Sequence, residues 1–335
     1  MTDDAEPPWL TYSRYLRQRH GRLVYRVAVD AGFTCPNRHG GRNGAGCTYC
    51  AEDGSRAPYL NAPAPDAWEA CETALRAQIG EARRFLVHRY GAEGFILFFQ
   101  AYSGTNAPVA VLRRVYDAGL AAGVFVGLNV ATRPDCIDAA KADLLASYTA
   151  RGLEVWVELG LQSANDDTLR RTRRGHTVEQ FLDAFRILRD RGIKVAAHLI
   201  LGLPGEGRVE IERTALFLAS LGIDGVKLHN LHIPAGTALA REYAMGEVVA
   251  PGPERHIENV IAVIERLPPS TVIMRLLCET PAERLLAPRG FPEKQSFTAR
   301  LVAAMRARGA RQGRLYAEVQ ADASGVALAD GRHAG

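Results

Sequence analysis

Three cysteines that share one glycine-rich loop are the residues of this chain best suited to chemistry. Cys47 and Cys50 are separated by two residues, a spacing that lets two thiolates bind one metal centre, and eleven residues separate Cys35 from Cys47. Four of those eleven residues are glycines, which let the backbone wrap closely. An electron-carrying [4Fe–4S] cluster normally takes four cysteines, so three leave one iron open to a substrate or cofactor. The loop therefore predicts a cluster used for chemistry rather than for electron storage.

Other uses of this loop remain open from the cysteines alone. A pair of cysteines two residues apart is often half of a zinc site, and His39 within the loop offers a fourth ligand. A disulfide is disfavoured because the chain starts MTDDAEPPWLTY, which lacks the pattern of a secretory signal, and we expect a cytoplasmic location. The other three cysteines have no partner at ligand spacing and are expected to fill the core: Cys71, Cys136 and Cys278.

The composition is that of an ordinary globular protein, with 335 residues, 47% hydrophobic and 23% charged. His, Gly or Pro interrupts the apolar stretches well before the roughly 18 residues that a membrane span needs, so we expect no membrane partner. The formal net charge of +4 permits a nucleic-acid partner without requiring one.

Strand-then-helix units repeat along the chain. Continuous apolar strands that alternate with helices indicate a parallel sheet covered on both faces, and right-handed crossovers close such units into most of a barrel. Strands are predicted at residues 23–31, 95–100, 124–131, 154–162, 194–203 and 225–233. Helices are predicted between them at residues 66–90, 107–121, 137–150, 166–173, 178–190 and 208–221.

The fold class is therefore α/β, a partial (β/α)6 barrel with a small C-terminal α/β extension. The predicted divisions are an N-terminal segment, the barrel, the extension and a mobile tail, over residues 1–22, 23–235, 236–312 and 313–335. Within the extension a helix, a strand and a helix are predicted at residues 255–266, 271–277 and 294–307.

Function in α/β barrels gathers at the carboxyl ends of the strands, and the cysteine loop follows the first strand. Polar residues end each of the other strands: Gln100 and Ser103, Asn129 and Arg133, Glu158, Gln162 and Ser163, the segment 198–206, and Lys227, His229 and His232. Lys227 and His229 share one face of the last strand and are candidates for substrate contact, whereas His232 points to the opposite face. Structural roles are the alternatives to substrate or cofactor contact: the histidines could form hydrogen bonds within the fold, and Glu158 could pair with a neighbouring arginine.

Six blocks of the sequence, in this order, resemble the YhcC-type radical SAM proteins: CPNRHGGRNGAGCTYC, FFQAYSGTNAP, GLNVATRPDCI, WVELGLQSANDDTLRRTRRGH, HLILGLPGE and KLHNLHIPAGT. These proteins belong to the branch that contains the Elongator catalytic subunit and the oxygen-independent coproporphyrinogen oxidases. The resemblance runs from Tyr15 to Pro288. The spacing of the first two cysteines departs from the commonest radical SAM loop but matches the YhcC-type pattern. His39 replaces an acidic residue that the family leads us to expect.

The resemblance implies a partial radical SAM barrel, with a [4Fe–4S] cluster on Cys35, Cys47 and Cys50 and S-adenosylmethionine (SAM) on the open iron. One electron, from a reductant such as flavodoxin or ferredoxin, would cleave SAM and yield a 5′-deoxyadenosyl radical that abstracts hydrogen from a substrate. Residues suited to SAM are Gln100 and Ser103 for its amino group, Arg133 for its carboxylate, Glu158, Gln162 and Ser163 for its ribose, and Ile200 and Gly202 for its adenine.

The resemblance favours tRNA as the substrate, modified at a uridine near the anticodon. Two basic stretches, residues 170–176 and 14–26, would suit phosphates, although a solvated helix surface explains them equally well. A small molecule, such as a porphyrin precursor or a peptide, is the second interpretation. A zinc- or cluster-stabilised binding protein without turnover is the third. The chain has no second three-cysteine cluster and no acetyltransferase domain, which argues against methylthiolation and acetyl-CoA-dependent chemistry.

Overall fold

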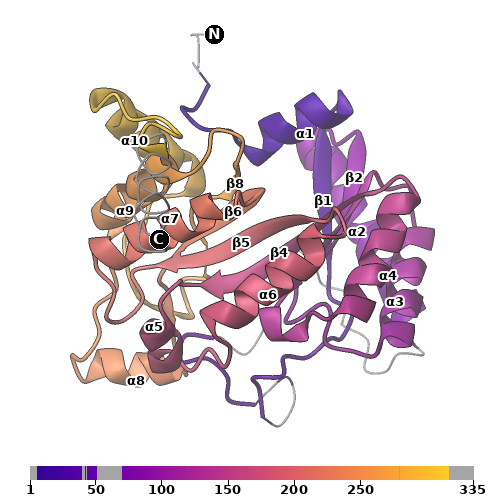
Figure 1. Cartoon of the computed structure of the whole chain (residues 1–335), viewed down its shortest axis with the longest axis horizontal. Coiled ribbons are helices and arrows are strands. Elements are labelled where there is room, and N and C mark those ends of the chain that lie inside the picture. The colour runs from indigo at the N-terminus through magenta and orange to yellow at the C-terminus, as the bar shows by residue number, and fades with distance from the viewer. Residues whose placement is uncertain (1–5, 40–41, 43, 51–69, 279, 317–335) are drawn as a thin grey trace, which may run out of the picture.

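A parallel sheet curled into a half-barrel forms the centre of the molecule (Figure 1). The computed structural model describes residues 6–39, 42, 44–50, 70–278 and 280–316. The sheet has seven strands in the order β1-β2-β3-β4-β5-β6-β8, and every neighbouring pair is parallel. Their bounds are β1 Val24–Val29, β2 Gly94–Phe99, β3 Gly127–Thr132, β4 Glu154–Gln162, β5 Lys194–Leu201, β6 Gly225–Asn230 and β8 Val272–Arg275.

The sheet confirms the predicted α/β half-barrel and adds a strand to it. β8, which the sequence assigned to a separate extension, pairs in parallel with β6, so that Gly225 lies opposite Val272. The predicted sixth strand is shorter than expected and ends at Asn230, so His232 lies beyond it. A separate two-stranded antiparallel sheet follows, made of β7 (Ile233–Pro234) and β9 (Leu285–Ala287).

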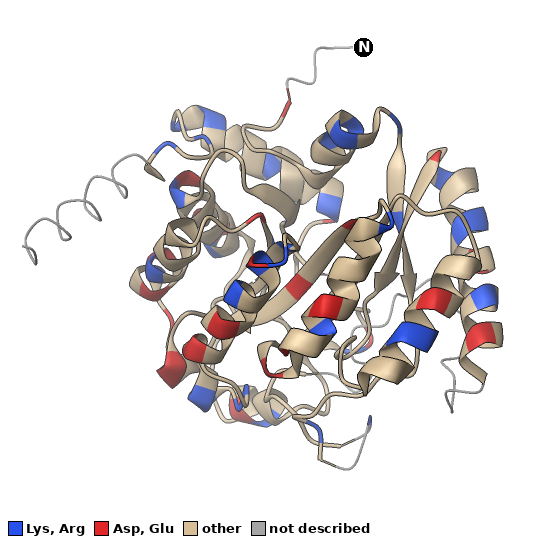
Figure 2. Ribbon diagram, turned by 45° about the vertical axis from the view of Figure 1, so that its right-hand side comes forward, with Lys and Arg blue, Asp and Glu red and all other residues tan. Residues whose placement is uncertain are grey.

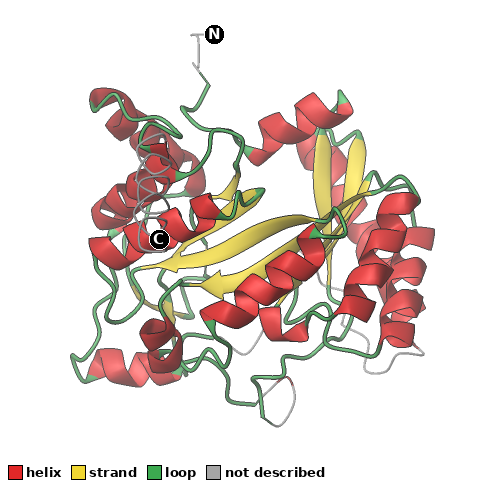
Figure 3. Cartoon of the chain, viewed as in Figure 1, coloured by secondary structure: helices red, strands yellow, loops and turns green. Residues whose placement is uncertain are grey.

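Helices pack against the outer face of the sheet (Figure 3). Odd-numbered residues of β4, such as Val155, Val157 and Leu159, belong to the large apolar cluster that these helices share with the sheet. The helices on this side are α2 Cys71–Tyr90, α3 Val109–Ala121, α4 Ala139–Ala150, α6 Val178–Arg189, α7 Arg208–Ser220, α9 Pro253–Arg266 and α10 Lys294–Ala307. Residues 66–69 of the helix predicted at residues 66–90, and most of the predicted tail, lie outside the described residues.

A helix that the sequence did not predict, α1 (Tyr12–His20), closes the amino-terminal end of the half-barrel. Tyr12 and Leu16 pack there with Trp156 of β4. Glu154, at the start of β4, accepts hydrogen bonds from Tyr15 and from Lys194 of β5. This arrangement leaves the carboxyl ends of the strands as the open edge.

Two short helices, α5 (Asp166–Arg171) and α8 (Ala238–Ala244), lie at that open edge together with the cysteine loop (Figure 1). A 3₁₀ turn, η3 (Pro134–Cys136), follows β3. Within the described part of the chain, no helix combines the length and the hydropathy that crossing a bilayer requires.

Candidate active site

The cysteine loop lies at the carboxyl edge of the sheet, directly after β1. Two tight turns shape it: the Arg38 amide donates to the Cys35 carbonyl oxygen at 3.0 Å, and the Cys50 amide donates to that of Cys47 at 3.0 Å. The Thr48 amide also donates to the Thr172 carbonyl oxygen at 3.0 Å, which ties the loop to the end of α5. Cys47 is buried, whereas Cys35 and Cys50 are half-buried.

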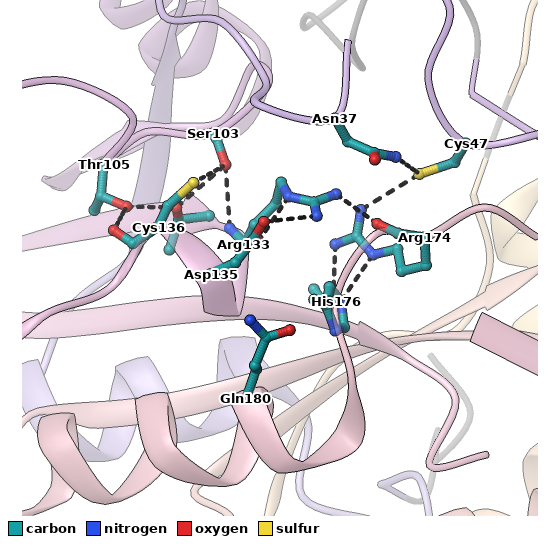
Figure 4. Close-up of polar contacts among 12 residues, drawn as sticks. Asn37, Cys47, Ser103, Thr105, Arg133, Asp135, Cys136, Arg174, His176 and Gln180 are labelled. Carbon is teal, nitrogen blue, oxygen red and sulfur yellow. Dashed lines mark hydrogen bonds and ion pairs between the residues drawn. The ribbon is translucent and has the colours of Figure 1, made fainter. Parts of the chain in front are cut away.

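Nitrogen donors point at two of the three sulfur atoms, and Figure 4 shows those at Cys47. Arg38 Nη2 lies 3.0 Å from Cys50 Sγ. Cys47 Sγ accepts from Asn37 Nδ2 at 3.3 Å and from Arg174 Nη1 at 3.7 Å. Such donors stabilise thiolates, the form in which cysteine binds metals.

The pKa values of Cys47 and Cys50 reflect a balance between burial and these cations. Burial on its own raises the pKa of Cys47, but the guanidinium groups of Arg174 and Arg133 outweigh it and lower that pKa. Burial and the neighbouring thiols raise the pKa of Cys50 in spite of Arg38. The same electrostatic interactions link Cys50 to both Cys47 and Cys35, so the three thiols share one environment.

Three cysteine thiols, with N–H donors at two of them, are the kind of ligand set that an iron–sulfur cube uses. A structural zinc site needs side chains that converge on one point. Among the residues that the structure describes, no three Cys, His, Asp or Glu side chains converge in this way, and His39 is exposed. In a [4Fe–4S] cluster each thiolate binds a different iron, so the sulfur atoms need only surround a common centre.

Arg133 and Ser103 form a buried connection between the loops after β2 and β3. The Arg133 amide donates to Ser103 Oγ at 3.2 Å. Its guanidinium pairs with both carboxylate oxygens of Asp135, at 2.8 and 2.9 Å, and donates to the Arg174 carbonyl oxygen at 2.9 Å. Arg133 therefore positions Arg174, and its contact with the SAM carboxylate stays a prediction.

Glu158 occupies the centre of a buried polar layer on the inner face of the sheet. It accepts from Arg26 Nη1 at 3.0 Å and is joined to His198 Nε2 at 2.9 Å and to Lys227. Burial by itself raises the pKa of Glu158, but Lys227, His198 and Arg26 lower it far below the usual value. The alternative that the sequence left open, pairing with a neighbouring arginine, is thus present, and contact with the ribose stays a prediction.

The predicted substrate residues Lys227 and His229 both face this interior. The Lys227 side chain is buried, and the His229 ring stacks on that of His198 with 5.5 Å between ring centroids. His232 lies outside β6 and is bonded to Thr280 at 2.7 Å.

The remaining predicted SAM residues lie along the ends of β2, β4 and β5. Gln100 directly follows β2 and is half-buried. Gln162 ends β4 with a φ of 74°, and the next hydroxyl, Ser163 Oγ, donates to Glu206. Ile200 packs in a small apolar cluster beside Tyr49 of the cysteine loop. Of these residues, Ile200 lies against the cysteine loop, and the contacts of all of them with SAM stay predictions.

Gly202 has a backbone conformation that suits glycine. Its φ is +92°, and a Cβ at this position would lie 2.3 Å from Cγ of Pro251. The sequence suggested that Gly202 lets the adenine of SAM approach the backbone closely. In the structure it is Pro251 of the same chain that approaches Gly202.

Sequence reasoning placed Arg174 and His176 in a surface patch, and this was wrong. Both side chains are buried, at 8% and 5% exposure. Arg174 Nη2 donates to the Gly160 carbonyl oxygen at 2.7 Å. Positive φ angles at Arg173 (54°) and Gly175 (75°) turn this segment back towards the sheet, a feature with no clear signal in the sequence. Arg26 was likewise counted as a surface cation but bonds to Glu158 inside the half-barrel.

The fold and the site define a radical SAM enzyme, and comparison with known proteins agrees. The Radical SAM superfamily model matches residues 35–218, and the Radical_SAM C-terminal domain model matches residues 223–306. The chain therefore belongs to the radical SAM superfamily, whose members use a [4Fe–4S] cluster and SAM.

Two relatives resemble the chain in sequence, and one solved structure shares its fold. Protein YhcC of Escherichia coli K12 is 38% identical over 273 residues, 82% of this chain and 84% of that protein. Elongator complex protein 3 of Bos taurus is 32% identical over 160 residues, which cover 47% of this chain and 28% of that protein. The structure of Elp3 from Methanocaldococcus infernus aligns with a TM-score of 0.61 at 21% identity, over 73% of this chain and 62% of that one. The resemblance to YhcC-type proteins is confirmed.

Proposed function

We propose that this chain holds a [4Fe–4S] cluster on Cys35, Cys47 and Cys50, and that with SAM bound this cluster supplies reductive cleavage of SAM and a hydrogen-abstracting 5′-deoxyadenosyl radical. The observation that carries the proposal is the set of N–H donors from Arg38, Asn37 and Arg174 around two of the sulfur atoms at the carboxyl edge of the sheet. These donors favour the anionic sulfur that iron binds. A small one-electron carrier such as flavodoxin or ferredoxin is the proposed reductant.

The chain's own residues hold and enclose this site. Arg133, fixed by Asp135, orients Arg174 against Cys47. α1 closes the opposite end of the half-barrel with Tyr12 and Trp156, which keeps water from entering there. Substrate is proposed to lie over the inner face of the sheet, where Lys227 and His229 contact it.

A tRNA uridine is the proposed substrate. Support comes from the similarity to Elongator proteins, which the sequence blocks already indicated. The exposed Arg173 lies beside the cysteine loop, because its carbonyl oxygen accepts from Asn37 Nδ2 at 2.8 Å. A phosphate that contacts this arginine would lie close to the reaction centre.

A small-molecule substrate is the second candidate, and the charge distribution favours it. The basic stretch 170–176 does not form one continuous positively charged surface, because Arg174 and His176 are buried and Arg171 pairs with Glu242 at 2.6 Å. On the outer helices, basic and acidic segments are interspersed (Figure 2). A long basic stripe would suit a nucleic-acid backbone better.

Anaerobic reconstitution tests the reaction. Wild-type protein is expected to bind four iron and four sulfide ions per chain, the content of one such cluster. After reduction it should release 5′-deoxyadenosine from SAM, measured by mass spectrometry. Cys47→Ala should lose the cluster and the product, whereas Cys71→Ala, a buried cysteine of α2, should keep both. One zinc per chain with no SAM cleavage would overturn the proposal in favour of a binding protein.

Nucleoside analysis tests the substrate. Total tRNA from a strain that lacks the gene is digested and compared with that of the parent strain by mass spectrometry. Loss of one modified uridine, restored by the wild-type gene and not by the Cys47→Ala gene, supports the tRNA assignment. An unchanged nucleoside profile contradicts it and leaves the small-molecule candidate.

A further inference from the structure

The buried layer around Glu158 joins two basic side chains to a single carboxylate. Arg26 and Lys227 both bond to Glu158, and Lys227 and Glu158 are almost completely buried. Burial, helped by the Lys227 charge, lowers the pKa of His198 to about 4, so this third partner is neutral near pH 7. Two basic side chains thus share one carboxylate, and burial together with the charges of Arg26 and Arg275 disfavours the ammonium form of Lys227 and lowers its pKa, so that an added anion would stabilise that form.

His229 adds an unused hydrogen-bonding group next to this layer. Its Nε2 atom is buried and has no hydrogen-bond partner in the described structure. Burial lowers the pKa of the His229 ring well below 6.5, and the charge of Arg275 lowers it further, so the ring is neutral near pH 7. A buried imidazole nitrogen without a partner is uncommon and points to a ligand that supplies one.

The position of His229 makes it available to a substrate. It follows Lys227 by two residues on the same face of β6, so it lies one level nearer the open edge. In the strand register Ile200 of β5 lies beside His229, whereas the small side chains of Ala28 and Ala131 pack with Phe98 elsewhere on the inner face. Solvent reaches the layer from this side, since the side chains of Arg26 and His198 remain 19% and 20% exposed.

We propose that the substrate carries an anionic oxygen group, a carboxylate or a phosphate, and that this group binds between His229 Nε2 and the Lys227 ammonium. The group completes the charge balance of the layer and accepts the hydrogen bond that His229 leaves unmade. This inference rests on the proposed radical SAM function, because it assigns what the substrate presents to the inner face of the sheet. A cationic substrate would be repelled at the same position.

The test uses the full-length, cluster-loaded protein. The cluster is kept oxidised so that SAM is not cleaved. SAM is present at saturation so that binding of its own carboxylate is not mistaken for binding of the added anion. Sodium acetate and inorganic phosphate are the probes, titrated into protein labelled with ¹³C-histidine and followed by NMR. The His229 signal is identified by its absence in His229→Gln. We expect one of the two anions to shift this signal saturably, and the tighter anion tells which group the substrate carries.

Lys227→Met should weaken that binding at least about ten-fold, the loss expected when a hydrogen bond to a charged group is removed. Glu158 keeps Arg26 and His198 in this variant, and a thermal melt checks that it folds. Lys227→Arg, which keeps the charge, provides a second variant and should bind more tightly than Lys227→Met. Arg186→Met, on exposed α6, removes the same charge elsewhere and should bind as the wild type does.

Two outcomes would overturn the inference: no shift of the His229 signal by either anion, or equal binding by Lys227→Met and the wild type. Neither outcome touches the proposed function, because SAM cleavage by the reduced wild-type protein is measured separately on the same preparation. Absence of that cleavage would instead remove the proposed function, whatever the anions do.

Discussion

Arg38 offers a way to separate hydrogen bonding from charge at the cysteine loop. Its guanidinium donates to Cys50 Sγ at 3.0 Å and lies over the Tyr102 ring. Reduction adds negative charge to a cluster, and a neighbouring donor or cation stabilises that charge. We therefore expect Arg38→Met to lower the reduction potential of the cluster, and Arg38→Lys to lower it less. An EPR-monitored redox titration measures both, and a potential unchanged in Arg38→Met would contradict the prediction.

Two glycines of the turn after β5 form a matched pair. Gly202 and Gly205 have φ angles of +92° and +87°, so alanine is strained at both. At Gly202 the added Cβ would lie 2.3 Å from Cγ of Pro251. At Gly205 no atom lies within 4 Å of an added Cβ. We expect Gly205→Ala to reduce the free energy of unfolding by about 1 kcal/mol and Gly202→Ala by clearly more. Urea denaturation measures both losses of unfolding free energy. Equal losses in the two variants would contradict the prediction and show that Pro251 moves aside freely.

At the scale of elements, α1 depends on contacts with the start of β4. Tyr15 bonds to Glu154, whose side chain is 6% exposed and also meets His20 and Lys194. Tyr15→Phe should lower the free energy of unfolding by about 1 kcal/mol, because a buried carboxylate loses one of its donors. Tyr25→Phe is the control, since Tyr25 stacks on Tyr90 at 5.3 Å between ring centroids and the stack is kept. Equal denaturant midpoints for the two variants would mean that this hydroxyl does not stabilise α1.

The same elements show what the sequence could predict and what it could not. The strands of the half-barrel are continuous apolar runs, so their positions were predictable from local pattern. α1 was missed because its nine residues are mostly polar, and its docking relies on Tyr12 and Trp156, which are far apart in the sequence. The place of β8 in the sheet depends equally on a long-range pairing, with β6.

The candidate site also has parts that the sequence could predict and parts that it could not. The spacing of Cys35, Cys47 and Cys50 is local, so the sequence alone could propose them as cluster ligands, and that assignment stays a prediction. The inward turn of Arg174 requires a left-handed backbone at Arg173 and Gly175, which a run of arginines does not reveal. The charge network of Glu158 joins β1, β4, β5 and β6, so only the assembled sheet brings its members together.

For the molecule as a whole, buried or half-buried histidines and a half-buried carboxyl group set opposite pH dependences of stability. Burial lowers the pKa values of His232 and His256 from 6.5 to about 4, so both stabilise the fold fully above pH 6.5 and lose that contribution as the pH falls towards 4. Burial raises the pKa of Glu206 from 4.5 to about 7, so its contribution is complete at low pH and is lost as the pH rises through that range. Because two histidines lose their contribution to the free energy of unfolding on acidification and only Glu206 gains one, we expect stability to fall as the pH is lowered.

His256 allows this balance to be measured. Its Nε2 lies 2.7 Å from the Leu276 carbonyl oxygen, a bond that a glutamine amide can also donate without titrating. With pKa values of 6.5 unfolded and about 4 folded, His256 should account for about 2 kcal/mol of the stability lost between pH 8 and pH 5. Urea unfolding of His256→Gln at the two pH values should therefore show a smaller loss than the wild type. If both proteins lose the same free energy, His256 is protonated in the folded state at pH 5, and its burial does not keep it neutral.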